Sequence, residues 1–363
     1  MENLNFFVNE ATKLLKPQGI DTMILYVTSR CNAKCNFCFY GDELNHVPEL
    51  ELKDITMISE KLGSLTGLLI GGGEPFLRTD LFEIVSAFVR NCHIKVVQIP
   101  TNGYFTDRVL NFLQKVTTEF PQLNVAIQVS IDAVGEKHDA VRELKGCFER
   151  AQKTVKVIKE FRRPHMHLRV LVVSVLTPQT MPSCEELAQY IREQLDPDYH
   201  WFEPVRDVPA MQKELNLSER TVEFLHSNLE YYLNKVKGSS SSVYANRILN
   251  RMIMQYTLNN FSIAYDNFIH KKRWPVHCCA GRKMAVLYPD GMLAACELRK
   301  ERVNLKEHSL DVNRAIRNEV FQIVREDIKQ HACDCTHGCF IPTSVRYAPG
   351  ELFRILGRLL FSQ

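Results

Sequence analysis

The sequence predicts an α/β fold: a parallel sheet curled into a partial (β/α)6 barrel, followed by a small cysteine-rich α+β domain. Short apolar, β-prone runs alternate with longer segments of helical spacing between residues 22 and 206. The runs are almost continuous in apolar residues, as expected of strands that helices cover. The twelve cysteines concentrate in two distant clusters, which indicates two sites.

The apolar runs predict six strands, at 22–28, 65–75, 94–103, 124–132, 167–175 and 199–206. The intervening segments predict helices at 51–63, 80–91, 106–119, 144–161 and 184–195. Residues 212–270 also look helical, and the segment "YPDGM" predicts a hairpin turn between two short strands. The polar, glycine-rich ends of the six strands should meet at one mouth, where barrels of this kind place their chemistry.

The pattern divides the chain into five parts. We expect an N-terminal extension at 1–20, the partial barrel at 21–210, a helical connector at 211–275, the cysteine-rich domain at 276–345 and an amphipathic helix at 346–363. For this last helix, attachment to the body of the protein is favoured over contact with a membrane.

Composition limits the function classes. With 45% hydrophobic and 24% charged residues and a net charge of +3, the chain is typical of a globular protein, with no general case for nucleic acid. No signal peptide and no membrane span are evident, so we expect a cytoplasmic protein. In a reducing compartment the cysteines indicate metal ligands or buried thiols rather than disulfides.

The first cluster, "SRCNAKCNFC", places Cys31, Cys35 and Cys38 on one loop directly after the first strand. Zinc in structural sites needs four ligands, and His46 is the only histidine close in sequence. Three cysteines without a fourth suit a cubane iron–sulfur cluster that leaves one iron open. The zinc site with His46 remains the alternative.

The loop and its neighbours resemble those of radical S-adenosylmethionine (SAM) enzymes. Phe37 precedes the third cysteine, and the segment "GGGEP" ends the second strand. The resemblance implies that the open iron of a 4Fe–4S cluster binds SAM and that backbone at Gly72, Gly73 and Glu74 holds its ammonium group. It also implies that Ser130 and Asp132 line the cofactor, and that Asn102 and Arg142 contact it.

The second cluster resembles the auxiliary-cluster domains called SPASM or twitch. Cys279 and Cys296 flank the predicted hairpin, and "CDCTHGC" supplies Cys333, Cys335 and Cys339. The resemblance implies one auxiliary 4Fe–4S cluster on Cys279, Cys296 and two of these three, with Cys335 and Cys339 favoured. Cys278 or Cys333 would be a spare or a substitute, and structural zinc remains the alternative.

The resemblance implies an enzyme that cleaves SAM to a 5′-deoxyadenosyl radical and abstracts hydrogen from a biosynthetic small-molecule, sugar or lipid-linked substrate. A low-potential donor such as ferredoxin or flavodoxin would supply the electron. A peptide-modifying maturase is the alternative within this class, and an iron–sulfur electron-transfer or scaffold protein is the alternative outside it. No catalytic side chain is assigned; Glu203 and Arg206, at the end of the sixth strand, would bind substrate or form a salt bridge.

Overall fold

The computed structural model describes residues 19–162, 167–206, 208–237, 247–331 and 335–361. Within this part, nine strands form one open sheet in the order β6-β5-β4-β3-β2-β1-β7-β8-β9. The strands are β1 (Thr22–Tyr26), β2 (Gly67–Gly71), β3 (Val96–Thr101), β4 (Asn124–Ser130), β5 (Leu168–Leu176), β6 (Tyr199–Pro204), β7 (Met284–Leu287), β8 (Met292–Ala294) and β9 (Arg302–Asn304).

The first six strands run parallel and curve into a barrel that does not close. The predicted α/β fold with a partial barrel is therefore confirmed, and each of the six observed strands lies within a predicted run or within one residue of it. Every residue of β1 is buried. In β4 and β5 buried residues alternate with half-buried ones, because one face lies against the helices and the other lines the barrel.

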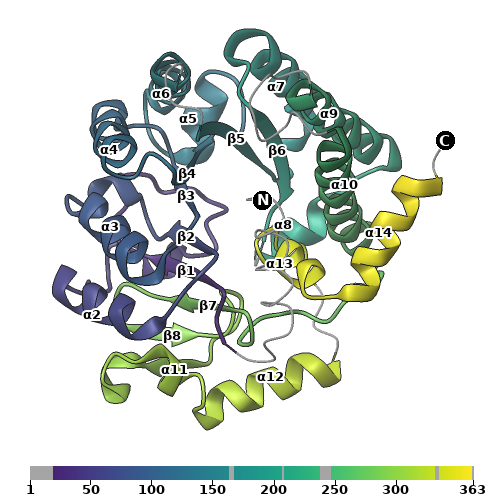
Figure 1. The fold of residues 1–363 in the computed structure, drawn as a ribbon. Coiled ribbons are helices and arrows are strands. Elements are labelled where there is room, and N and C mark those ends of the chain that lie inside the picture. The colour runs from purple at the N-terminus through teal and green to yellow at the C-terminus, as the bar shows by residue number, and fades with distance from the viewer. Residues whose placement is uncertain (1–18, 163–166, 207, 238–246, 332–334, 362–363) are drawn as a thin grey trace.

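Helices cover the outside of this sheet (Figure 1). Those of the barrel are α2 (Leu52–Leu62), α3 (Leu81–Cys92), α4 (Thr106–Glu119), α5 (Glu136–Arg142), α6 (Cys147–Arg162) and α7 (Cys184–Tyr190), the last continued by a π-helical turn to Leu195. Five of the six match predicted helices; the short α5 does not. Three further helices follow the barrel: α8 (Pro209–Glu214), α9 (Glu219–Lys237) and α10 (Arg247–His270).

The cysteine-rich region continues the sheet rather than standing apart from it. β7 pairs in parallel with β1, from Thr22 opposite Met284 to Leu25 opposite Leu287. The predicted hairpin is present as the antiparallel pair β7–β8, and β9 extends it. The remaining helices are α11 (Val312–Ala315), α12 (Glu319–His331), α13 (Phe340–Arg346) and α14 (Pro349–Phe361). The strand that precedes the first cysteine loop and the first strand of the cysteine-rich region are thus direct neighbours in the sheet.

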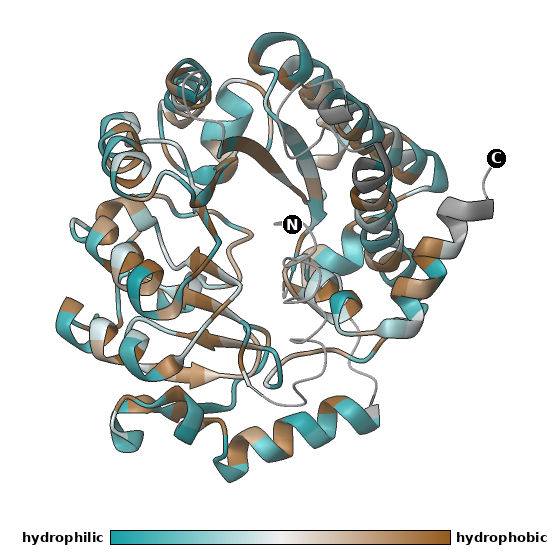
Figure 2. Cartoon of the chain, in the orientation of Figure 1, coloured by the Kyte–Doolittle hydropathy of each residue, from teal (hydrophilic) through white to brown (hydrophobic). Residues whose placement is uncertain are grey.

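Apolar side chains form a single buried core that runs from the barrel strands into the hairpin. Figure 2 shows hydrophobic residues on the strands and on the helix sides that face them. The C-terminal helix α14 lies along α10, where Glu351 accepts a hydrogen bond from the amide of Asn259 at 3.0 Å. None of the described helices is both long and apolar enough to cross a membrane.

Candidate functional site

The first cysteine loop leaves the C-terminal end of β1 and turns back on itself. The N–H of Cys38 donates to the carbonyl of Cys35 at 3.1 Å, and the side chain of Asn45 accepts from the N–H of Cys31 at 3.0 Å. All three thiols are partly buried, and burial raises the pKa of Cys31 to about 12. Cys35 and Cys38 raise it further, because their thiols lie near that of Cys31. Metal binding would have to offset the free energy of deprotonating these thiols, because only the thiolate is a ligand.

Within the described residues, no three His, Cys, Asp or Glu side chains converge closely enough to hold a single metal ion. His46 is exposed on the loop.

The glycine turn after β2 lies directly against this loop. The N–H groups of Gly73 and Glu74 donate to the carbonyls of Thr28 and Arg30, each at 2.8 Å. A Cβ atom at Gly73 would lie 2.1 Å from the carbonyl oxygen of Arg30, so no side chain fits there. Among the described residues, nothing donates to the carbonyls of Gly72 and Gly73. The turn therefore presents two acceptor oxygens beside the cysteine loop.

The side chain of Glu74 is buried and faces β3 instead of the turn. It accepts from the N–H of Phe76 at 3.1 Å, from the hydroxyl of Thr101 at 2.9 Å and from the N–H of Asn102 at 2.7 Å. Burial raises the pKa of Glu74 to about 7, against the effect of these three donors. The amide of Asn102 donates in turn to Asn32, next to Cys31, at 2.8 Å. Glu74 and Asn102 thus join the glycine turn, β3 and the cysteine loop.

A buried ion pair supports the loop from the other side. Arg142 donates to the carboxylate of Asp132 at 2.7 Å, and its guanidinium lies 5.4 Å from the ring centre of Phe37. Burial raises the pKa of Cys35, whereas the guanidinium of Arg142 lowers it. The second carboxylate oxygen of Asp132 accepts from the N–H of Val175. Both oxygens of Asp132 are therefore occupied by protein donors.

Ser130 is the last residue of β4 and is half-buried. The structure brings it and the other barrel residues named from the sequence to the same end of the sheet, since all follow the C-terminal ends of β1 to β4. Those residues are Phe37, Gly72, Gly73, Glu74, Asn102, Ser130, Asp132 and Arg142.

A clamp at the base of the loop was not evident from the sequence. Buried Arg78 donates to the carbonyls of Val27 and Leu50, each at 2.8 Å, and pairs with Asp80. Glu49 accepts from the guanidinium of Arg30 at 3.0 Å. Arg78 therefore fixes both ends of the segment that carries the three cysteines. Its only sequence signal is an arginine three residues after "GGGEP".

The second cysteine group collects under the hairpin. Cys279 is buried, and its N–H donates to the hydroxyl of Ser344 at 3.0 Å. Burial raises the pKa of Cys296, and Cys335 and Cys278 raise it further, so these three thiols are neighbours. The charged neighbours of Cys339 are Glu297, Arg206 and Glu203. Cys333 lies outside the described residues.

The isolated cysteines Cys92, Cys147 and Cys184 are all buried.

A buried polar network links the two cysteine groups, and of its members the sequence pointed only to Glu203 and Arg206. Glu297, directly after Cys296, accepts from the hydroxyl of Tyr26 at 2.7 Å and pairs with His337. Arg206 lies 2.8 Å from Nδ1 of His337 and forms an ion pair with Glu203 at 3.5 Å. Burial alone would raise the pKa of Glu297, but His337 and Arg206 outweigh it and lower the pKa to about 2.

Arg206 also reaches the first loop, because its guanidinium lies 5.1 Å from the ring centre of Phe39, next to Cys38. Glu203 and Arg206 thus form a salt bridge.

The family comparison matches residues 25–191 to the model described as the Radical SAM superfamily. The matched segment begins in β1 and ends at α7, so it contains the cysteine loop, the glycine turn and the Asp132–Arg142 pair.

Curated relatives align mainly with parts of the chain. The GTP 3',8-cyclase of Aquifex aeolicus is 34% identical over 110 residues, which are 28% of this chain and 33% of that protein. The sporulation killing factor maturation protein SkfB of Bacillus subtilis is 28% identical over 39% of this chain and 33% of its own length. The chain thus spans about a third of these relatives. A probable GTP 3',8-cyclase of Methanococcus maripaludis is 22% identical over 86% of this chain and 93% of that protein.

Solved structures share the fold over most of the chain. SuiB of Streptococcus suis, bound to the precursor peptide SuiA, superposes with a TM-score of 0.60 at 17% identity, covering 94% of this chain and 77% of that one. Native anSMEcpe with bound AdoMet gives a TM-score of 0.55 at 14% identity, covering 93% and 99%.

Proposed function

Because residues 25–191 of this chain belong to the radical SAM superfamily, we propose that the protein is an enzyme that cleaves SAM reductively and abstracts hydrogen from a biosynthetic substrate. Members of the superfamily use a 4Fe–4S cluster and SAM, which when bound supply a 5′-deoxyadenosyl radical. In this chain Cys31, Cys35 and Cys38 would hold the cluster. The protein's own tasks are to hold these groups, to orient the substrate and to exclude water.

The observation that carries the proposal is the fixed contact between the cysteine loop and the glycine turn. Two backbone hydrogen bonds of 2.8 Å set the spacing, and they use the N–H groups of Gly73 and Glu74. No donor from the described part of the chain reaches the carbonyls of Gly72 and Gly73. Since an ammonium group only donates, these acceptors suit the amino group of SAM.

The surrounding residues take two kinds of role in this proposal. We assign contact with the cofactor to Asn102, Ser130 and Phe37. Asp132 and Arg142 are better suited to position the loop, because both carboxylate oxygens of Asp132 accept from protein donors and Arg142 faces Phe37 and Cys35.

We assign one auxiliary 4Fe–4S cluster to Cys279, Cys296 and two of Cys333, Cys335 and Cys339. The nearness of Cys335 and Cys278 to Cys296 supports Cys335 and makes Cys278 a competing ligand. Structural zinc stays the alternative for this group.

The substrate class is proposed to be a small molecule, a sugar or a lipid-linked intermediate, with ferredoxin or flavodoxin as electron donor. Peptide modification is the second candidate. It is favoured by the similarity to SkfB, named a maturation protein, and to SuiB, solved with its precursor peptide. An iron–sulfur electron-transfer or scaffold protein would not need a glycine turn that offers two carbonyl acceptors to an ammonium group, so the turn favours an enzyme that binds SAM.

Anaerobic reconstitution with iron and sulfide, followed by dithionite and SAM, tests this function. We expect roughly eight iron atoms per chain and release of 5′-deoxyadenosine. Roughly four would remove the auxiliary cluster from the proposal. Alanine at Cys31, Cys35 and Cys38 should abolish nucleoside release while Cys92→Ala retains it. Release that persists without the three loop cysteines would refute the assignment.

A further inference from the structure

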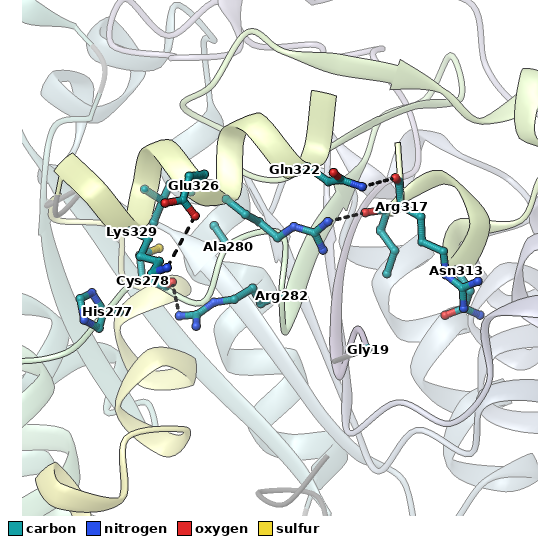
Figure 3. A pocket seen from close by; sticks show the side chains of 13 residues that line it. Gly19, His277, Cys278, Ala280, Arg282, Asn313, Arg317, Gln322, Glu326 and Lys329 are labelled. Atoms are coloured by element: carbon teal, nitrogen blue, oxygen red, sulfur yellow. Dashed lines mark hydrogen bonds and ion pairs between the residues drawn. The ribbon is translucent and has the colours of Figure 1, made fainter. Parts of the chain in front are cut away.

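A cavity of about 710 Å³ lies between α12 and the segment that follows Cys278 (Figure 3). It is at the opposite end of the sheet from the first cysteine loop. Its residues Ala280 and Arg282 precede β7, whose first residue Met284 pairs with Thr22, the first residue of β1. The volume is in the range of pockets that hold small organic ligands.

The lining of this cavity carries an excess of positive charge. Arg282, Arg317, Arg325 and Lys329 line it, and Glu326 is the single acidic residue among its lining residues. Glu326 already lies 3.7 Å from the ammonium of Lys329. None of the three arginines is paired with a carboxylate in the described part of the chain. Within the described residues, three cationic side chains therefore lack a paired carboxylate.

Two of these arginines are held in place by backbone carbonyls. Arg325 donates to the carbonyl of Ile316 at 2.9 Å, and Arg282 donates to that of Cys278 at 2.9 Å. A guanidinium has five N–H donors, so each keeps donors for another acceptor. Burial lowers the pKa of Arg325, and the charge of Arg282 lowers it further, which shows that the two cations repel each other.

We propose that this cavity binds a small organic molecule through a phosphate group held by Arg282 and Arg325. Anchored guanidinium groups match the geometry of phosphate oxygens and bind them in pairs of hydrogen bonds. Figure 3 shows Cys278 and Lys329 at one end of the cavity and Arg317 and Asn313 at the other. The volume of about 710 Å³ leaves room for an organic group beside the phosphate.

The remaining lining suits the uncharged part of such a ligand. Ala280, Ile316 and Ile328 offer apolar surface, and Asn313 and Gln322 offer amides. The site is separate from the proposed SAM site and does not depend on it.

Calorimetric titration of the full-length protein with inorganic pyrophosphate, at constant ionic strength, tests the proposal. We expect saturable binding that weakens by about tenfold or more in Arg325→Gln and in Arg282→Gln. Arg314→Gln is the matched control, because it removes the same charge from an exposed residue nearby that does not line the cavity. Equal weakening in the control, or no saturable heat in the wild type, would overturn the proposal.

Arginine footprinting of the wild-type protein gives a second test that does not depend on the folding of a variant. Pyrophosphate should slow the modification of Arg282 and Arg325 by phenylglyoxal and leave Arg314 unchanged, as read by mass spectrometry. Equal rates with and without pyrophosphate contradict the site. Iron content and 5′-deoxyadenosine release of Arg325→Gln should equal those of the wild type, which keeps this result apart from the proposed function.

Discussion

Gly73 is the residue at which the cysteine loop and the glycine turn come closest. A Cβ there would meet the carbonyl oxygen of Arg30 at 2.1 Å and its carbon at 2.6 Å, and both are backbone atoms that cannot swing away. We therefore expect Gly73→Ala to lower the free energy of unfolding by about 1–3 kcal/mol. The backbone displacement that the added methyl group forces should also weaken SAM binding by the reconstituted protein, as measured by equilibrium dialysis.

Gly350→Ala is the control for this substitution, since nothing lies within 4 Å of a Cβ at that position in α14. It should leave SAM binding unchanged and raise stability by up to about 1 kcal/mol, as alanine favours helix over glycine. If Gly73→Ala matched the wild type in stability and in SAM binding, a side chain would fit at this position after all.

His138 controls a pH dependence at the residue scale. Its Nδ1 accepts from the N–H of Asp132 at 3.0 Å, so the folded protein holds it neutral. Burial lowers the pKa of His138 to about 4, whereas a histidine in the unfolded chain titrates near ~6.5. Between these values only the unfolded chain binds the proton, so its contribution to stability is present above pH ~6.5 and is lost as pH falls to about 4.

The expected size of this loss is up to about 3 kcal/mol, from a shift of roughly two and a half pKa units. Urea unfolding of the wild type and of His138→Gln across this window measures it. The wild-type curve should fall more steeply toward acid than that of the variant. Parallel curves would mean that His138 does not stay neutral in the fold.

At the scale of elements, the loop between β1 and α2 is rigid because its two ends are tied to one side chain. Arg78 is only 5% exposed and donates to carbonyls at both ends of the loop. Arg78→Met should cost about 3–5 kcal/mol, because it leaves Asp80 and two carbonyls without their donor. Hydrogen exchange in residues 27–50 should accelerate, as measured by mass spectrometry.

Arg90→Met offers a comparison on the surface. Its side chain is 63% exposed and pairs with Glu119, so its loss should cost less than about 1 kcal/mol. Exchange in residues 27–50 should not change. If both arginine variants behave alike, the clamp does not hold the loop.

At the scale of the whole molecule, the network around Glu297 joins β1, the end of β6 and the cysteine-rich region. Glu297→Ala would leave His337 buried without its carboxylate and would remove a negative charge near Arg206, so we expect a loss of about 3–5 kcal/mol. Tryptophan fluorescence can follow it, since Trp201 lies on β6 and the indole of Trp274 donates to the carbonyl of Cys335.

Glu301→Ala removes a more exposed carboxylate that pairs with Arg299, and it should change stability by less than about 1 kcal/mol. A Glu297→Ala protein with wild-type stability would show that the network does not join these parts.

The barrel was predictable because its strands are short, almost continuous apolar runs, and such runs between helical segments predict buried strands. The helix α5 was not, because its seven residues, "EKHDAVR", carry no apolar stripe of helical period. It is stabilised by contacts with the rest of the protein, where its residues His138 and Arg142 are buried.

The parts of the site that were predictable are local in sequence, such as the cysteine loop and the glycine turn. Arg78 and the network around Glu297 were not, because their partners lie far apart along the chain. Arg206 and His337 are separated by 131 residues, and no spacing rule connects them. Long-range polar contacts are set by how elements meet in space, which a single sequence does not display.

The parallel pairing of β7 with β1 has a consequence for any attempt to divide this protein. A fragment that ended before residue 276 would leave every buried residue of β1 beside a row of unpaired N–H and carbonyl groups. Such an open, apolar margin recruits other chains and leads to aggregation. The N-terminal three-quarters should therefore be insoluble when expressed alone, and co-expression with the missing C-terminal quarter should rescue it.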